Sequence, residues 1–143
     1  MIGSSLGARA LSAALLLAVS QAGCGDPGSE AERARVLYAL DALRDAPAEA
    51  LSARADLLTA LASAPAHDGS PAAGARDACV AAYRPLLEGS ALTAELRAET
   101  GKGSEHLVAA APKLLEAEQK IEQSRAKMPA CEAAAARLRL RRR

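Results

Sequence analysis

The chain has few side chains that are large enough to build a core, and this shortage limits its fold more than any other feature. Of its 143 residues 38 are alanine, Phe and Trp are absent, and Tyr38 and Tyr83 are its two aromatic residues. Alanine is the best helix former, whereas the β-branched and aromatic residues that favour strands are scarce. The composition therefore predicts an all-α protein: a small antiparallel bundle of four or five helices with proline breaks.

The first residues have the features of an export signal. Arg9 and the terminal amine precede an uncharged, mostly apolar run of ten residues, 10–19. A membrane-spanning helix needs about 20 apolar residues, whereas a run of about ten fits the apolar region of a secretory signal. The tripeptides 18–20 and 20–22 both fit the small-x-small rule for ordinary signal cleavage.

The next residues support a second interpretation. Gln21-Ala22-Gly23-Cys24 resembles the lipobox of bacterial lipoproteins, in which small residues precede a cysteine, with Gln21 where that family usually has an aliphatic residue. The resemblance implies that Cys24 receives a diacylglyceryl group and becomes the mature N-terminus. It implies an exported protein, lipid-anchored to the bacterial cell envelope on its periplasmic or cell-surface side. Residues 1–23 are then the signal peptide, 24–29 a tether, and 30–143 a helical domain with a basic C-terminal tip.

The count of three cysteines is consistent with lipidation. An odd number in an exported protein leaves one thiol unexplained. If Cys24 carries the lipid, Cys79 and Cys131 can form a disulfide in an oxidising compartment. Such a bond would close a loop of about 50 residues and contribute about 4 kcal/mol in the chain-entropy model. The alternatives are that Cys24 is removed or stays a free thiol, and that Cys79 and Cys131 are buried free thiols.

Proline and glycine divide the domain into helical segments. We expect a first helix over 30–45 capped by Ser29, and a second from Pro47 to about residue 64, followed by a loop over 65–70. A third helix should begin at Ser70-Pro71. Pro85 is expected to kink or end it, and Gly89-Ser90 to break the chain before a further helix over 91–100.

The last segment has the most regular pattern. After the turn at 101–103, where Ser104 is expected to cap the helix that follows, large side chains recur every seven residues, and small ones lie three positions after each of them. The large residues are Leu107, Leu114, Ile121 and Met128, and the small ones are Ala110, Ala117, Ser124 and Cys131. Alternating large and small residues lets helices pack closely, so this stripe predicts a seam within the bundle. Pro112 is expected to start or interrupt this helix, and Pro129 to bend it.

The sequence holds no CxxC, HExxH, EF-hand or P-loop pattern. His67 lies beside Asp68 and near Ser70, but neighbours in one loop do not form a triad, so we expect an exposed loop histidine. We therefore expect no catalytic residue, metal site or cofactor, and no enzyme. A secreted hydrolase centred on His67 is the weakest hypothesis.

The C-terminus carries a second candidate site. Five of the last seven residues are arginine, namely Arg137, Arg139, Arg141, Arg142 and Arg143. Such a tip can contact anionic lipid or cell-wall polymer, and basic patches commonly supplement a lipid anchor. An exported protein without interleaved aromatic residues is not expected to bind nucleic acid. The leading hypothesis is a non-enzymatic envelope lipoprotein that acts as a structural or partner-binding module. The alternative is a module that binds anionic surfaces through this tip, and a solvated terminus is the simplest reading.

Overall fold

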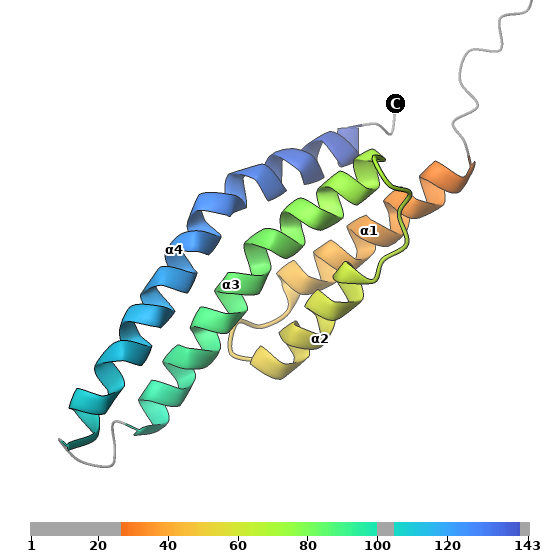
Figure 1. The fold of residues 1–143 in the computed structure, drawn as a ribbon. Coiled ribbons are helices and arrows are strands. Elements are labelled where there is room, and N and C mark those ends of the chain that lie inside the picture. Colours follow the sequence, from red (N-terminus) through yellow and green to blue (C-terminus); the bar gives the residue numbers. More distant parts are fainter. Residues whose placement is uncertain (1–26, 100–104, 141–143) are drawn as a thin grey trace, which may run out of the picture.

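The protein is an all-α bundle of four helices within the residues that the computed structural model describes, 27–99 and 105–140. The helices are α1 (Pro27–Asp45), α2 (Leu51–Ala62), α3 (Pro71–Glu99) and α4 (Glu105–Leu140). They run alternately up and down, so that sequence neighbours are antiparallel (Figure 1). The predicted fold class is confirmed.

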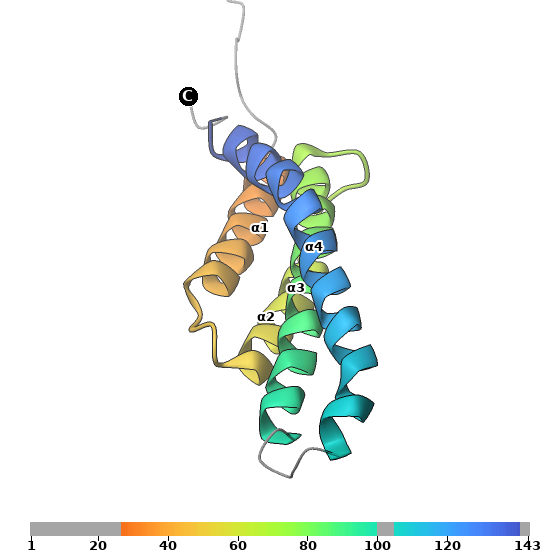
Figure 2. The same cartoon turned by 90° about the vertical axis from the view of Figure 1, so that its left-hand side faces the viewer.

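The two hairpins differ in length. Helices α3 and α4 have 29 and 36 residues, whereas α1 and α2 have 19 and 12. The short pair covers one part of the long pair, and the rest of α3 and α4 continues beyond it as a two-helix arm (Figures 1 and 2). We call the covered part the proximal half, and we call the part from Glu88 onwards on α3 and up to Ile121 on α4 the distal arm.

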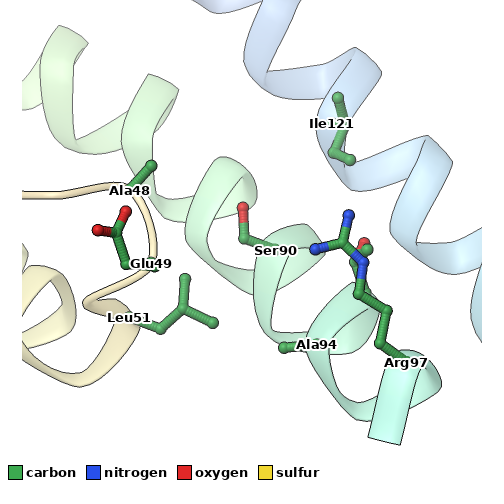
Figure 3. A pocket seen from close by; sticks show the side chains of 8 residues that line it. Ala48, Glu49, Leu51, Ser90, Ala94, Arg97 and Ile121 are labelled. Atoms are coloured by element: carbon green, nitrogen blue, oxygen red, sulfur yellow. The ribbon is translucent and has the colours of Figure 1, made fainter.

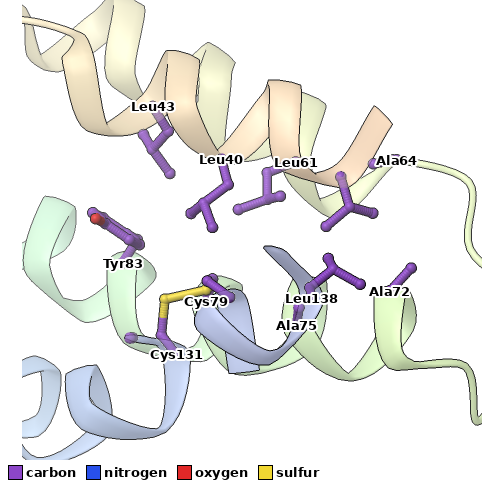
Figure 4. Packing of buried hydrophobic residues seen from close by; sticks show 13 residues of the cluster. Leu40, Leu43, Leu61, Ala64, Ala72, Ala75, Cys79, Tyr83, Cys131 and Leu138 are labelled. Atoms are coloured by element: carbon purple, nitrogen blue, oxygen red, sulfur yellow. A yellow bond between two sulfur atoms is a disulfide. The ribbon is translucent and has the colours of Figure 1, made fainter. Parts of the chain in front are cut away.

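The core lies in the proximal half (Figure 4). Its members are mostly aliphatic residues of α1 and α2 and small residues of α3 and α4, joined by the larger Tyr83 and Leu138. The buried residues of this core are Val36, Leu40, Leu43, Leu61, Ala64, Ala72, Ala75, Cys79, Ala82, Tyr83, Cys131, Ala135 and Leu138. Small residues on α3 and α4 let these two helices approach closely, while the large residues of the shorter helices fill the remaining space. A chain with few large apolar residues thereby concentrates them in one cluster.

Several predicted boundaries are wrong. Helix α1 begins at Pro27, inside the predicted tether, so Ser29 lies within the helix rather than at its cap. Proline is favoured in a first helical turn, because its fixed φ suits the helix and it lacks the N–H that would be unpaired there. Helix α2 begins at Leu51 rather than at Pro47, and a turn closed by a hydrogen bond from Ala50 N to Pro47 O (3.1 Å) precedes it.

Helix α3 continues through both of its predicted breaks. Pro85 and Gly89 are buried inside it, so the segment 91–100 is not a separate helix, and the bundle has four helices in its described part. Pro112 and Pro129 likewise lie inside α4. A proline costs a helix one hydrogen bond, but contacts with a neighbouring helix can hold the two sides together as one element. The expected cap at Ser104 falls outside the described residues.

The start of α3 agrees with its prediction. The hydroxyl of Ser70 accepts a hydrogen bond from the backbone N–H of Ala73 (3.1 Å), and Pro71 is the first helical residue. Just before the cap, Gly69 has φ of +77°, a left-handed conformation that side chains rarely adopt. The conformation of the loop that precedes α3 is therefore explained by its own residues, Gly69 and Ser70.

Candidate functional site

The predicted disulfide is confirmed and joins α3 to α4. The sulfur atoms of Cys79 and Cys131 are 2.08 Å apart and both residues are buried. It links two positions that are 52 residues apart in the sequence and lies within the proximal core (Figure 4). It is a structural feature, since neither sulfur is free to react.

The seam of α4 is centred on its small residues rather than on its large ones. The small residues Ala117, Ser124 and Cys131, spaced by seven, are buried, and the same row ends in the larger buried Leu138. By contrast, Leu114 is 50% exposed, and Ile121 and Met128 are partly buried. The predicted period was therefore right, but the sequence did not show which of its two rows faces α3. Leu107 lies outside the residues whose side chains the structure describes.

Gly89 explains how closely α3 and α4 pack at the start of the distal arm. A Cβ atom at this position would lie 2.9 Å from the carbonyl oxygen of Ala117 and 3.0 Å from Cγ1 of Ile121. Only a residue without a side chain allows this approach. Sequence reasoning took Gly89 for a helix break, whereas it is a contact point.

Ion pairs also hold the distal arm together. Lys113 of α4 lies 3.3 Å from Glu99 and 3.7 Å from Glu95, and Lys120 pairs with Glu88. The hydrogen bond from Lys120 to Glu88 raises the pKa of this lysine. Exposed pairs of this kind contribute little to stability, because water and salt screen them. The arm therefore has fewer strong stabilising contacts than the proximal half.

Only part of the arginine tip lies within the described residues. Arg137 and Arg139 lie in the last turn of α4 and are exposed, and Arg139 forms an ion pair with Asp41 of α1. Leu140 beside them is 73% exposed. Arg141, Arg142 and Arg143 lie outside the described residues, as does Cys24. Leu138, between the two described arginines, is buried and belongs to the core.

The start of α1 and the end of α4 lie at the same end of the bundle (Figure 1). The α3–α4 turn lies at the opposite end. In the sequence Cys24 precedes the first residue of α1 by three positions. The two candidate attachment points, Cys24 and the arginine tip, thus flank helix ends that are neighbours in space.

A groove lies where α1 and α2 stop covering the long helices. It has a volume of about 450 Å³ and is lined by the α1–α2 connection, by α3 and by α4: Ala48, Glu49, Leu51, Ser90, Thr93, Ala94, Arg97 and Ile121 (Figure 3). Sequence reasoning missed this groove, because it treated Ile121 as part of a closed seam. The last helical segment of the sequence is longer than the first two, and this difference in length could have indicated the groove.

The candidate catalytic residue shows no catalytic arrangement. His67 is exposed in the α2–α3 loop, and the hydroxyl of Ser70 is engaged as the cap of α3. In 27–99 and 105–140, no three His, Cys, Asp or Glu residues are grouped so that they could hold a metal ion.

Among the helices described, none is both long and apolar enough to cross a membrane. Comparison with known proteins finds no matching family, no matching curated protein and no matching solved structure.

Proposed function

We propose that the protein is a non-enzymatic lipoprotein of the bacterial cell envelope, anchored through Cys24, whose helical bundle serves as a structural or partner-binding module. The observation that carries this proposal is the position of the helix ends. Helix α1 begins three residues after Cys24, at the end of the bundle opposite to the α3–α4 turn. A lipid at Cys24 would hold that end at the membrane and direct the distal arm away from it. The exposed His67 and the capping role of Ser70 support a role without catalysis.

Mass spectrometry of the mature protein tests the anchor. We expect an N-terminal Cys24 that carries a diacylglyceryl group, and we expect Cys24→Ser to move the protein from the membrane fraction to the aqueous fraction. Cys79→Ala with Cys131→Ala is the matched control, because it removes cysteines without touching the anchor and should leave the protein in the membrane fraction. An unmodified terminus at Gln21 or Gly23 would refute the proposal and leave an ordinary secreted protein.

A second candidate function is contact with an anionic surface through the arginine tip. Its support is that Arg137 and Arg139 project from the last turn of α4 at the end where α1 begins, with exposed Leu140 between them and the final arginines. A single acyl chain holds a protein weakly, and basic residues close to an anionic membrane add about 1 kcal/mol each.

The test must leave the fold intact. Deleting residues 136–143 would also remove the buried Leu138, so we choose Arg→Gln at 137, 141, 142 and 143, which keeps the pair of Arg139 with Asp41. The unlipidated protein should sediment with vesicles rich in phosphatidylglycerol at low salt, less so at high salt, and the variant should not. The matched control neutralises four exposed cations elsewhere, Arg44, Arg84, Arg125 and Lys127. Equal binding by the two variants, or no binding by the wild type, would sink this candidate.

A further inference from the structure

Helix α2 carries a positive charge on the side that faces the core. Arg54 precedes Leu58 by four residues and the buried Leu61 by seven, so the three side chains lie on one side of this helix. Arg54 is partly buried, and its Nε atom is buried without a hydrogen-bond partner among residues 27–99 and 105–140. No carboxylate of these residues forms an ion pair with it. A buried donor without a partner is unfavourable, so Arg54 has a bonding position that the described chain leaves open.

A second arginine and a phenol lie beside Arg54. Arg44, exposed in the last turn of α1, and Arg54 both favour the ionised form of the Tyr83 hydroxyl. Such an effect requires a nearby charge, so both guanidinium groups lie close to this oxygen. Tyr83 is at one end of the core cluster, and its oxygen points away from Leu40 and from the disulfide (Figure 4). Arg44, like Arg54, forms no ion pair within the described part of the chain, so two unpaired arginines meet one phenol where α1 ends and α2 begins.

The start of α2 adds to the positive charge at this place. Its N-cap residue is Ala50, which makes no side-chain cap, and its first turn holds no acidic residue. The first N–H groups of a helix have no partner within it, and the helix dipole makes this end positive. Glu132 of α4 acts on the Tyr83 hydroxyl in the opposite sense, but its effect is smaller than that of either arginine. The charge around the phenol is therefore positive on balance.

We propose that Arg44, Arg54 and the hydroxyl of Tyr83 bind a phosphate-like oxyanion at the edge of the core. A guanidinium group donates two parallel hydrogen bonds to the oxygens of such an anion, and the phenol can donate a third to another oxygen. A tetrahedral anion uses more of these donors than a carboxylate, which has two oxygens. The Nε–H of Arg54 would gain its missing partner when the flexible side chain turns its guanidinium group towards the anion. This proposal does not depend on the lipid anchor.

Tyrosine fluorescence tests the site. The sample is the mature chain, residues 24–143, with Cys24→Ser to exclude the lipid and Tyr38→Phe to leave Tyr83 as its tyrosine. Sodium phosphate at pH 7, added at constant ionic strength, should change the emission along a one-site curve with a dissociation constant of about 1 mM. Sulfate should do the same, and acetate should bind at least about threefold more weakly. The absence of a saturable change with phosphate, or equal binding of acetate, would overturn the proposal.

Charge-removing variants in the same sample assign the binding to the two arginines. Arg54→Gln and Arg44→Gln should each weaken phosphate binding about tenfold, and Arg44 is exposed, so its substitution leaves the packing of the core intact. The matched control is Arg84→Gln, because Arg84 is also exposed and follows Tyr83 in the sequence but lies on another side of α3. Melting curves without phosphate show whether each variant is folded. Equal affinity for phosphate in Arg44→Gln and Arg84→Gln would refute the site.

The titration of Tyr83 shows whether the anion lies against the phenol. Arg44 and Arg54 lower the pKa of this hydroxyl and Glu132 raises it, and a bound anion should raise the pKa further because it disfavours the phenolate. Sulfate, which keeps its charge at alkaline pH, should therefore move the midpoint upwards relative to chloride at equal ionic strength. Arg54→Gln should remove this difference between the two salts. A midpoint that is the same in sulfate and in chloride before any substitution would show that the anion does not contact Tyr83, and would overturn the proposal.

Discussion

The proximal half and the distal arm contain the same two helices but hold them together differently. In the proximal half, a disulfide and a layer of fully buried leucines from α1 and α2 fix α3 against α4. In the distal arm, the described links are a glycine contact, a row of small residues, exposed ion pairs and one buried leucine, Leu96. Small residues bring helices close but bury little apolar area, so the arm depends on the proximal half for most of its stability.

Of the changes that test this comparison, removal of the disulfide is expected to lower the free energy of unfolding most. Cys79→Ala with Cys131→Ala keeps both sites apolar and removes only the covalent link. We expect a loss of about 4 kcal/mol in the free energy of unfolding, because the cross-link no longer restricts the unfolded chain. For a domain of this size the loss corresponds to a fall in Tm of roughly 10–20 °C.

Thermal unfolding followed by circular dichroism measures this fall. The wild type under reducing conditions should melt close to the double variant, which controls for any effect of the alanine side chains. A Tm that stays within a few degrees of the wild-type value would mean that the leucine layer alone holds the two halves together.

A substitution at Gly89 tests how tightly α3 and α4 are held together where the proximal half meets the distal arm. Gly89→Ala would force a Cβ atom against the carbonyl oxygen of Ala117 and against Lys120 (3.2 Å) and Ile121. Alanine in a helix is favoured over glycine by about 1 kcal/mol, but overpacking costs about 1–3 kcal/mol. We therefore expect a net destabilisation of about 1 kcal/mol, together with a loss of amide protection in the arm.

Gly74 provides the matched control, because it lies in the same helix and a Cβ atom there meets nothing within 4 Å. Gly74→Ala should stabilise the protein by about 0.5–1 kcal/mol. Urea unfolding of both variants, with hydrogen exchange to locate the change, compares them directly. If both substitutions stabilise to the same extent, α3 and α4 are not in tight contact at Gly89.

The fold class and the disulfide could be predicted because they follow from local or countable features. Alanine content predicts helices, and the Ser70-Pro71 pair predicts the start of α3. The assignment of Cys24 to a lipid, itself a prediction, leaves two of the three cysteines to pair. Boundaries at Pro85 and Gly89 could not be predicted in the same way. A proline or glycine breaks an isolated helix, but here packing against α4 outweighs the local preference, and nothing in the local sequence reports that contact.

The candidate site was only partly predictable for a similar reason. The seven-residue period of α4 shows that one face of this helix packs against the bundle. Two rows of residues, one large and one small, fit this period. The small row faces α3 because the two helices lie close together, and the sequence does not show this closeness. The groove beside Ile121 arises from the difference in length between two hairpins. That difference becomes visible only when α3 is known to run unbroken to Glu99.

Ionisation of Tyr83 tests whether water reaches the core of the proximal half. Of the predictions made, this one has the smallest expected effect on stability. Tyr83 is 8% exposed, and burial raises the pKa of its phenol, while the charges of Arg44 and Arg54 oppose this rise. The folded-state pKa therefore lies above the unfolded value of about 10. A group whose pKa is raised on folding stabilises the protein fully below its unfolded pKa, and this contribution is lost as the pH rises through the folded pKa.

Absorbance near 295 nm measures this titration directly in a Tyr38→Phe variant, where Tyr83 is the remaining tyrosine. We expect a midpoint above pH 10 in the folded protein and a shift to about 10 in urea. Stability measured at pH 8 and at pH 11 should fall more for the wild type than for Tyr83→Phe, which cannot ionise and so cancels the common titration of lysines. A midpoint at or below pH 10 in the folded state would mean that water reaches the phenol, and that the layer of α1 and α2 over α3 is looser than the leucine contacts indicate.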